Sequence, residues 1–150
     1  MNEQQPKLPA RRTFLAAGAV LGSTVAAIDA GAQTTPAGKH KVVFHVAAPV
    51  GFFNNVNNII EAFAADGGIQ VMVVFNGQGL NMLVKAKSEY ETQLRAAADK
   101  GVKLAACQNS MKRLKVATED LFPFAAQVDS GVAELVRKQE SGWAYIKAGE

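Results

Sequence analysis

Two continuous apolar runs constrain the fold of this chain more than any other feature, and they are residues 41–47 (KVVFHVA) and 69–75 (IQVMVVF). A strand that is apolar at nearly every position must be covered on both faces, as in a parallel sheet. Between the runs, residues 54–68 (NNVNNIIEAFAADGG) carry apolar side chains at helical spacing, with an Asn available as N-cap and Gly67-Gly68 at the end. This order predicts two parallel strands joined by a right-handed helical crossover.

The same alternation continues to the end of the chain. A helix is expected over residues 88–101, where Ser88 and Glu91 have the spacing of a capping box and Gly101 is the terminator. We expect short helical segments over residues 79–87, 108–115 and 118–122, strands over 102–107, 124–128 and 143–147, and a helix over 130–142 capped by Asp129. The sequence therefore predicts an α/β domain with a mainly parallel five-stranded sheet and helices on both faces.

Ligand sites in such sheets lie beyond the carboxyl ends of the strands. Four segments should share that edge of the molecule: residues 48–49, 76–77, 107–109 and 128–129. The only cysteine in the chain, Cys107, belongs to this set because it ends the third strand.

A helix start at Asn109 or Ser110, directly after Cys107, offers amide donors and positive potential that lower the pKa of a thiol. Basic side chains follow within two turns: Lys112, Arg113 and Lys115. We therefore expect Cys107 to be an exposed, ionisable thiol at the rim of the sheet. The alternative is that it is a small buried hydrophobe.

Other candidates surround this thiol in the predicted fold. Asn76-Gly77 is either a simple turn or backbone that approaches the sulfur closely. We assign substrate binding to six residues: Asn76, Gly77, Asn109, Ser110, Lys112 and Arg113.

His45, inside the first strand, is interpreted as a hydrogen-bonded core histidine rather than a base. No metal site or cofactor is predicted, because one cysteine excludes a zinc site of clustered cysteines and Gly77-x-Gly79 lacks the rest of a dinucleotide motif.

The first 32 residues have the pattern of a twin-arginine secretory signal. Arg11-Arg12, a mild apolar stretch ending near Ile28, and the small residues 30–32 occur in the required order. The stretch is too short and too rich in Ala and Gly to span a bilayer. We expect cleavage after residue 32, a flexible lead-in over residues 33–40, one domain over 41–150, and a periplasmic protein without membrane contact. An uncleaved anchor or a disordered basic arm is the alternative.

Removing the signal leaves 118 of the 150 residues, enough for one compact domain. These carry 13 Lys and Arg against 11 Asp and Glu, so the net charge of about +2 excludes a strongly basic nucleic-acid-binding surface. A lone cysteine cannot form an intrachain disulfide. In an oxidising compartment it stays free, pairs between chains or is modified.

Over nearly all of residues 39–149 the chain resembles the DsrE/DsrF-like family. The resemblance lies in VVFHV, NNVNNIIEAF, VMVVFNGQGLNML and GVKLAACQNSMKR, the last of which contains the cysteine. It implies a three-layer α/β/α subunit that assembles into trimers or hexamers. In the sulfur-relay members, it implies a persulfide on the cysteine at the place of Cys107, accepted from one protein and passed to another.

Two functions follow as hypotheses. In the first, a periplasmic, sulfurtransferase-like carrier takes sulfane sulfur from an unidentified donor protein onto Cys107 and passes it to an acceptor protein, with nearby amides and Lys112 or Arg113 stabilising the anion. In the second, the protein is a non-catalytic oligomeric module that binds a small molecule and has an inert cysteine. A thioredoxin-like or rhodanese-like enzyme is weaker, since there is no second cysteine and CQNSMKR lacks the glycines of a rhodanese loop. Self-association is also expected from two apolar segments, residues 51–53 and 121–124.

Overall fold

The computed structural model of the protein describes residues 38–149. The predicted secretory signal and most of the predicted lead-in lie outside the described residues. None of the helices within residues 38–149 has the length and apolar character needed to cross a membrane.

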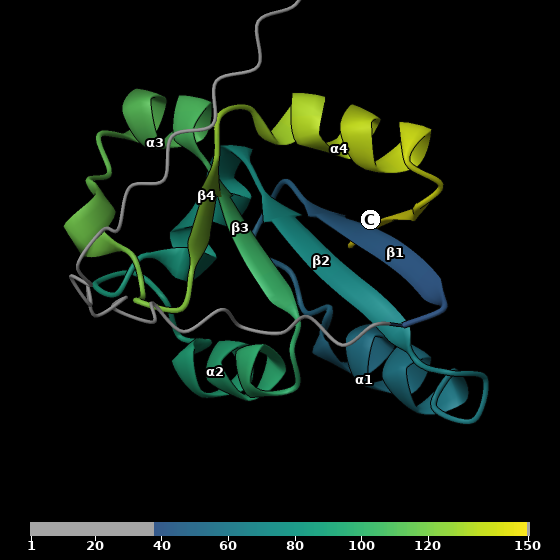
Figure 1. Cartoon of the computed structure of the whole chain (residues 1–150). Coiled ribbons are helices and arrows are strands. Elements are labelled where there is room, and N and C mark those ends of the chain that lie inside the picture. The colour runs from purple at the N-terminus through teal and green to yellow at the C-terminus, as the bar shows by residue number, and fades with distance from the viewer. Residues whose placement is uncertain (1–37, 150) are drawn as a thin grey trace, which may run out of the picture. The chain divides into compact units, whose positions relative to one another are not determined.

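Five strands form one sheet in the order β4-β3-β2-β1-β5, and each neighbouring pair runs parallel (Figure 1). They are β1 (His40–Val46), β2 (Ile69–Phe75), β3 (Lys103–Cys107), β4 (Ala126–Val128) and β5 (Ala144–Lys147). The predicted parallel sheet is confirmed. β4 is shorter than expected, because the chain makes a turn at Pro123 that is closed by a hydrogen bond from the Ala125 N–H to the Phe122 carbonyl.

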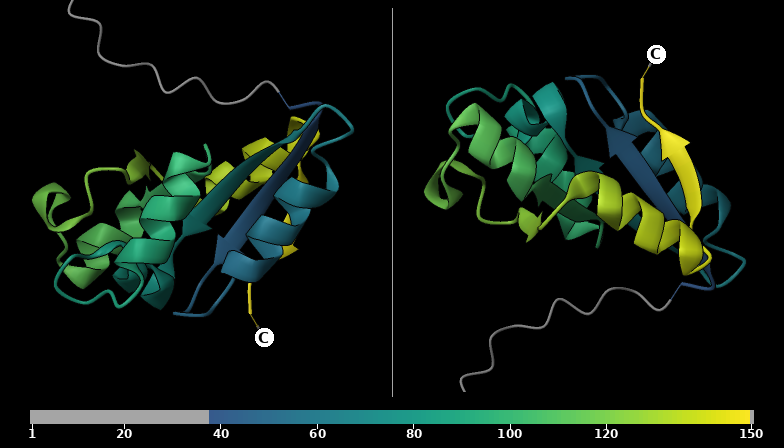
Figure 2. Two further views of the ribbon diagram at one scale, coloured as in Figure 1. Left: turned by 90° about the horizontal axis from the view of Figure 1, so that it is seen from below. Right: turned by 90° about the horizontal axis from the view of Figure 1, so that it is seen from above.

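Helices cover both faces of the sheet. α1 (Phe53–Ala62) and α2 (Glu91–Asp99) lie below the sheet in Figure 1, and α3 (Gln108–Leu114) and α4 (Gly131–Glu140) lie above it. Seen from above in Figure 2, α3 and α4 lie in front of the strands, and β5 lies beside β1. Two short 3-10 helices, η1 (Gly77–Leu83) and η2 (Thr118–Asp120), complete the connections.

Successive strand residues alternate between two apolar cores. In β1, Val42, Phe44 and Val46 belong to the larger core, which also holds side chains of α1, α2 and η1. Val43 belongs to the smaller core, which Leu135 of α4 closes. Side chains two residues apart in a strand point to the same face of the sheet. His45 follows Val43 by two residues and Cys107 follows Ala105 by two, so both face α4.

The starts of α1 and α2 differ from the prediction. The residue before α1 is Phe52, which is buried in the larger core, and no asparagine side chain caps the helix. Tyr90 precedes α2, and the Ser88 hydroxyl accepts a hydrogen bond from the Tyr90 N–H at 3.1 Å, so the predicted capping box is wrong. Packing of the two aromatic residues, rather than a polar cap, fixes where these helices begin.

α3 begins at residue 108, as one prediction had it, and both α3 and α4 differ from the prediction in their N-cap residues. α3 starts at Gln108, which makes Cys107 itself the N-cap residue. α4 is capped by Ser130, whose side chain accepts from the Ala133 N–H, and not by Asp129. Both helix starts lie against the thiol, since Cys107 caps α3 and the Gly131 N–H at the start of α4 donates to its sulfur.

The two apolar segments expected at the surface belong largely to the interior. Phe52, Leu121 and Phe122 are buried, and Phe53 and Phe124 pack against the larger core. The described residues that do expose large apolar side chains are Val132, Val136 and Tyr145. These two segments are therefore not the expected exposed surface, and within residues 38–149 the exposed large apolar side chains lie on α4 and β5.

Candidate functional site

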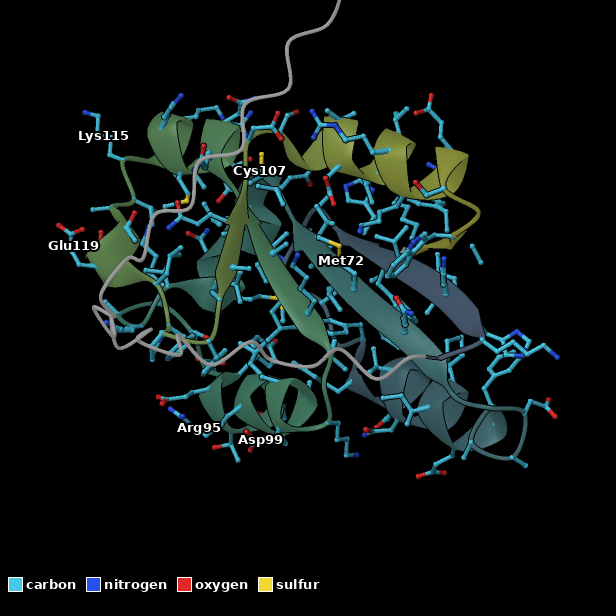
Figure 3. All side chains as sticks on the ribbon, viewed as in Figure 1. Met72, Arg95, Asp99, Cys107, Lys115 and Glu119 are labelled. Carbon is cyan, nitrogen blue, oxygen red and sulfur yellow. The ribbon has the colours of Figure 1, made fainter. Side chains whose placement is uncertain are left out.

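Cys107 lies at the carboxyl edge of the sheet, between the starts of α3 and α4 (Figure 3). Phe75 pairs with Ala106, so Asn76 follows beside Cys107, and Cys107 itself pairs with Val128. The edge predicted from the ends of the strands is confirmed.

The sulfur of Cys107 accepts a hydrogen bond from the Gly131 N–H at 3.1 Å. Gly131 is the first residue of α4, and a Cβ added there would lie 3.1 Å from Cβ of Cys107 and 3.1 Å from Cγ1 of Val74. The absence of a side chain therefore allows the helix to start directly against the sheet, with its first amide aimed at the sulfur.

Ser110 supplies further donors from the first turn of α3. Its hydroxyl oxygen accepts from the Gly77 N–H at 2.9 Å, which leaves the hydroxyl hydrogen available to the Cys107 sulfur. The backbone amides of Ser110 and Asn109 face the same sulfur and stabilise its ionised form. The thiol thus lies between the positive ends of two helices.

These donors decide the protonation of the thiol. Burial raises the pKa of Cys107, but the hydrogen bonds from Gly131, from the Ser110 hydroxyl and from the Ser110 and Asn109 amides favour the thiolate. Together they outweigh burial, and the pKa of Cys107 lies below its ordinary value. A lowered pKa increases the fraction of thiolate, which is the nucleophilic form, at any given pH.

The expectation that this thiol is exposed was wrong. Cys107 is only 4% exposed, because the start of α4 covers it. Its immediate surroundings are nevertheless polar, with Ser110 and the Gly131 amide in contact and Asn76 on the next strand. The backbone at the start of α4 therefore covers the sulfur, through the Gly131 N–H.

The six predicted binding residues divide into two groups. Asn76, Gly77, Asn109 and Ser110 gather around Cys107 as described above. Nη2 of Arg113 lies 3.9 Å from the position of a Cβ added at Gly77, at the border of this group.

Lys112 lines a different pocket, of about 470 Å³, with Lys115, Gln108 and Gln127. Cys107 is not part of its lining. The largest effects on the pKa of Cys107 come from burial and from the Gly131, Ser110 and Asn109 donors. The helix starts are therefore the main groups that stabilise the thiolate.

A row of side chains that sequence reasoning did not connect crosses the same edge. Nε2 of His45 lies 3.0 Å from Oδ1 of Asn76, and Nδ1 of His45 lies 2.9 Å from the Tyr145 hydroxyl. These hydrogen bonds link Tyr145 of β5 through His45 of β1 to Asn76 at the end of β2, and Asn76 lies beside Cys107 of β3. The prediction that His45 is hydrogen-bonded is confirmed, but it is half-buried rather than part of the core, and its partners belong to the edge of the site.

Gly131 is the other residue that the sequence did not single out. The signal was present, since residues 128–129 were expected at this edge and a helix start was expected directly after them. That this start would face Cys107 depends on the order of β3 and β4, which only the structure gives.

Comparisons with known proteins agree with this architecture. A search of curated proteins finds no match. Among solved structures, MTH1491 from Methanobacterium thermoautotrophicum, described as a protein of unknown function, is 30% identical with a TM-score of 0.64 and covers 72% of this chain and 98% of its own. The ychN protein from E. coli shares the fold at 14% identity and a TM-score of 0.56, over 72% of this chain and 98% of its own.

The model of the DsrE/DsrF-like family matches residues 39–148, which include every strand and the whole site around Cys107. This span also covers the segments on which the resemblance was based. The chain belongs to the DsrE/DsrF-like family.

Proposed function

We propose that this protein carries sulfane sulfur as a persulfide on Cys107. The observation that supports this most strongly is the convergence of donors on one sulfur, with the Gly131 N–H at 3.1 Å and the first turn of α3 on the other side. These donors make the thiolate available as a nucleophile. They can also stabilise the negative charge of a bound sulfur species.

The transfer step balances without an added oxidant. The Cys107 thiolate attacks the sulfane sulfur of a donor persulfide, R–S–SH, and forms a new S–S bond. The S–S bond of the donor breaks, its electron pair leaves with R–S⁻, and that thiolate takes up a proton from solvent. Passing the sulfur to an acceptor thiolate is the same step in reverse, with Cys107 as the leaving group. The donor and the acceptor would be other proteins.

Access to the sulfur has to involve the start of α4. The 4% exposure of Cys107 leaves little surface for a donor to approach. Opening requires loss of one hydrogen bond to the sulfur, from Gly131, and of local packing at the helix end. Openings of this size occur without global unfolding.

The test is intact mass spectrometry of the reduced protein after treatment with polysulfide. We expect an adduct of about 32 Da, one sulfur atom, that is removed by reductant. The matched control is Cys107→Ser, which keeps nearly the same side-chain volume and should take up no sulfur. Wild-type protein that stays unmodified would contradict the proposal, as would equal uptake by the serine variant.

A second candidate function is binding of a small anionic molecule by an oligomeric protein in which Cys107 is inert. It is favoured by the burial of Cys107 and by the 470 Å³ pocket between α3, η2 and β4, which presents Lys112 and Lys115. Alkylation separates the two functions. Iodoacetamide should modify native protein readily in the first case, and only after unfolding in urea in the second.

Export by the twin-arginine route, with a periplasmic site of action, is part of the same proposal. It is supported by the paired arginines Arg11 and Arg12, followed by an apolar stretch and small residues. Cell fractionation tests it. Arg11→Lys together with Arg12→Lys should retain the protein in the cytoplasm, whereas unchanged periplasmic recovery would contradict twin-arginine export.

A further inference from the structure

His45, Asn76 and Tyr145 form a hydrogen-bonded row whose protonation can be worked out from its atoms. Oδ1 of Asn76 can only accept, so Nε2 of His45, at 3.0 Å, carries the proton. In the neutral ring Nδ1 is then an acceptor, and the Tyr145 hydroxyl at 2.9 Å donates to it. Both ring nitrogens of His45 therefore have a hydrogen-bond partner.

This arrangement leaves the Nδ2 group of Asn76 as a donor. Within residues 38–149 it makes no hydrogen bond to a protein group, and because no buried side-chain nitrogen or oxygen there lacks a partner, this donor is open to solvent. Asn76 continues β2 past Phe75, the partner of Ala106, which places it next to Cys107. A Cβ added at Gly131 would lie 3.1 Å from Cβ of Cys107 and 3.3 Å from Cβ of Asn76, so the two side chains border the same small space.

We infer that Asn76 donates its Nδ2 hydrogen to the outer sulfur of the Cys107 persulfide, and that His45 and Tyr145 are positioning residues that hold the carboxamide in this orientation. The inference rests on the proposed persulfide. The outer sulfur is about 2 Å from Sγ along the S–S bond and is anionic after loss of its proton, so it requires a donor beyond those that reach Sγ itself.

His45 is needed because the two ends of a carboxamide have nearly the same shape. Without the Nε2 donor, the Asn76 amide can rotate by about 180° and present its oxygen to the anionic sulfur, which is repulsive. Tyr145 acts one step further away. Without its hydroxyl donor, the proton of His45 can move to Nδ1, and Nε2 then becomes an acceptor that attracts the Nδ2 group of Asn76.

The test is the lifetime of the persulfide. Each variant is loaded with polysulfide, the excess is removed, and the sulfur adduct is followed by intact mass over time. His45→Phe should shorten the lifetime about ten-fold, the effect of one lost hydrogen bond to a charged group. Tyr145→Phe should shorten it less.

Rescue by a conservative variant separates positioning from a structural role. His45→Gln places an amide nitrogen near the position of Nε2 and should restore most of the lifetime, although it replaces the ring. Matched controls are His40→Phe, since His40 packs against Phe63 at the opposite end of β1, and Tyr90→Phe, on the α2 side of the sheet. Both should behave as wild type. Nitrogen-15 spectra should also show His45 as the Nε2–H tautomer.

The outcomes distinguish this inference from the proposed function. If wild-type protein takes up no sulfur, both are overturned. If wild type takes up sulfur and His45→Phe retains it for as long, only the inference is overturned. If His45→Gln loses sulfur as fast as His45→Phe while both remain folded, the donor role of Nε2 is overturned.

Discussion

Cys107 has a lowered pKa despite its burial because several donors converge on one atom. Burial alone would keep the thiol neutral, and the Gly131 amide and the donors of the first turn of α3 reverse that tendency. The position of Cys107 at a strand end could be predicted from the sequence. The partnership with Gly131 could not, because 24 residues separate the two and their contact depends on the neighbouring places of β3 and β4 in the sheet.

The lowered pKa of Cys107 should make stability depend on pH. The unfolded chain binds more protons than the folded one at pH values between the lowered pKa and the ordinary thiol value of about 8.5. The free energy of unfolding of wild type should therefore rise relative to Cys107→Ser as pH increases through that window, and the gain should vanish as pH falls through the folded pKa. Urea unfolding of both proteins from pH 5 to pH 9 measures this difference. A difference that falls with rising pH would mean that burial dominates.

A second prediction isolates the Gly131 amide. Proline is favoured in the first turn of a helix, and Ser130, at φ −139° and ψ 119°, has the backbone expected before proline. Gly131→Pro removes the N–H donor and should raise the pKa of Cys107. Gly131→Ala is the matched control, because it adds a Cβ in the same space but keeps the donor. The pH dependence of thiolate absorbance reports both values, and identical pKa values would exclude a role for this amide.

At the scale of the elements, the connection from β4 to α4 is the part of the fold that most directly positions the site. Arg137 donates to both carboxylate oxygens of Asp129, at 2.9 and 3.0 Å, and ties the residue before the cap to the second turn of α4. The hydrogen bond from Arg137 keeps the pKa of Asp129 well below its usual range. Because both side chains are exposed, this ion pair contributes little to the free energy of unfolding. Its main effect is on the orientation of the chain at the start of α4.

Ser130 should contribute more than Asp129 to the stability of the start of α4, because its side chain caps the helix. Its side chain accepts from the Ala133 N–H at 3.4 Å, and loss of an N-cap serine typically costs about 1 kcal/mol. Ser130→Ala should lower the free energy of unfolding by about that amount and speed alkylation of Cys107 by loosening the start of α4. Thr92→Ala, at an exposed position of α2, is the control. Faster hydrogen exchange in α4 without faster alkylation would show that loosening the start of α4 does not expose Cys107.

The sequence was a good guide to the strands and a poor guide to the helix starts. Residues 69–75 were predicted as a strand with the bounds that β2 has, since a run of buried β-branched residues has few other solutions. The starts of α1 and α2 were missed because buried Phe52 and partly buried Tyr90 set them by tertiary packing. A capping pattern reflects only the local sequence, and at these two helix starts the packing of aromatic side chains in the core overrides it.

At the scale of the whole molecule, α4 links the site to a candidate contact surface. Val132 and Val136 are 60% and 48% exposed, one turn apart, and Val132 follows Gly131 directly. Apolar side chains exposed together on one helix face are typical of protein–protein contacts. Assembly on this face would cover the start of α4 and thereby control access to Cys107.

Self-association is therefore predicted to depend on α4. Light scattering of wild type at micromolar concentration should give a trimer or hexamer, and the double variant Val132→Glu, Val136→Glu should shift the mass towards the monomer, because two charges cannot be buried cheaply at an interface. Ala96→Glu adds a charge to an exposed position of α2 and should leave the mass unchanged. Monomeric wild type would contradict the prediction.

The most direct measurement is the ionisation of Cys107 itself. Because the chain has one cysteine, protein labelled with carbon-13 at the cysteine Cβ gives a single resonance, whose shift with pH follows the thiol without requiring a reagent to reach it. A lowered pKa predicts an inflection clearly below about 8.5, and a return towards that value in Gly131→Pro but not in Gly131→Ala. An inflection at or above the ordinary value in wild type would mean that burial outweighs the helix ends, and that no nucleophilic thiolate is held at this edge of the sheet.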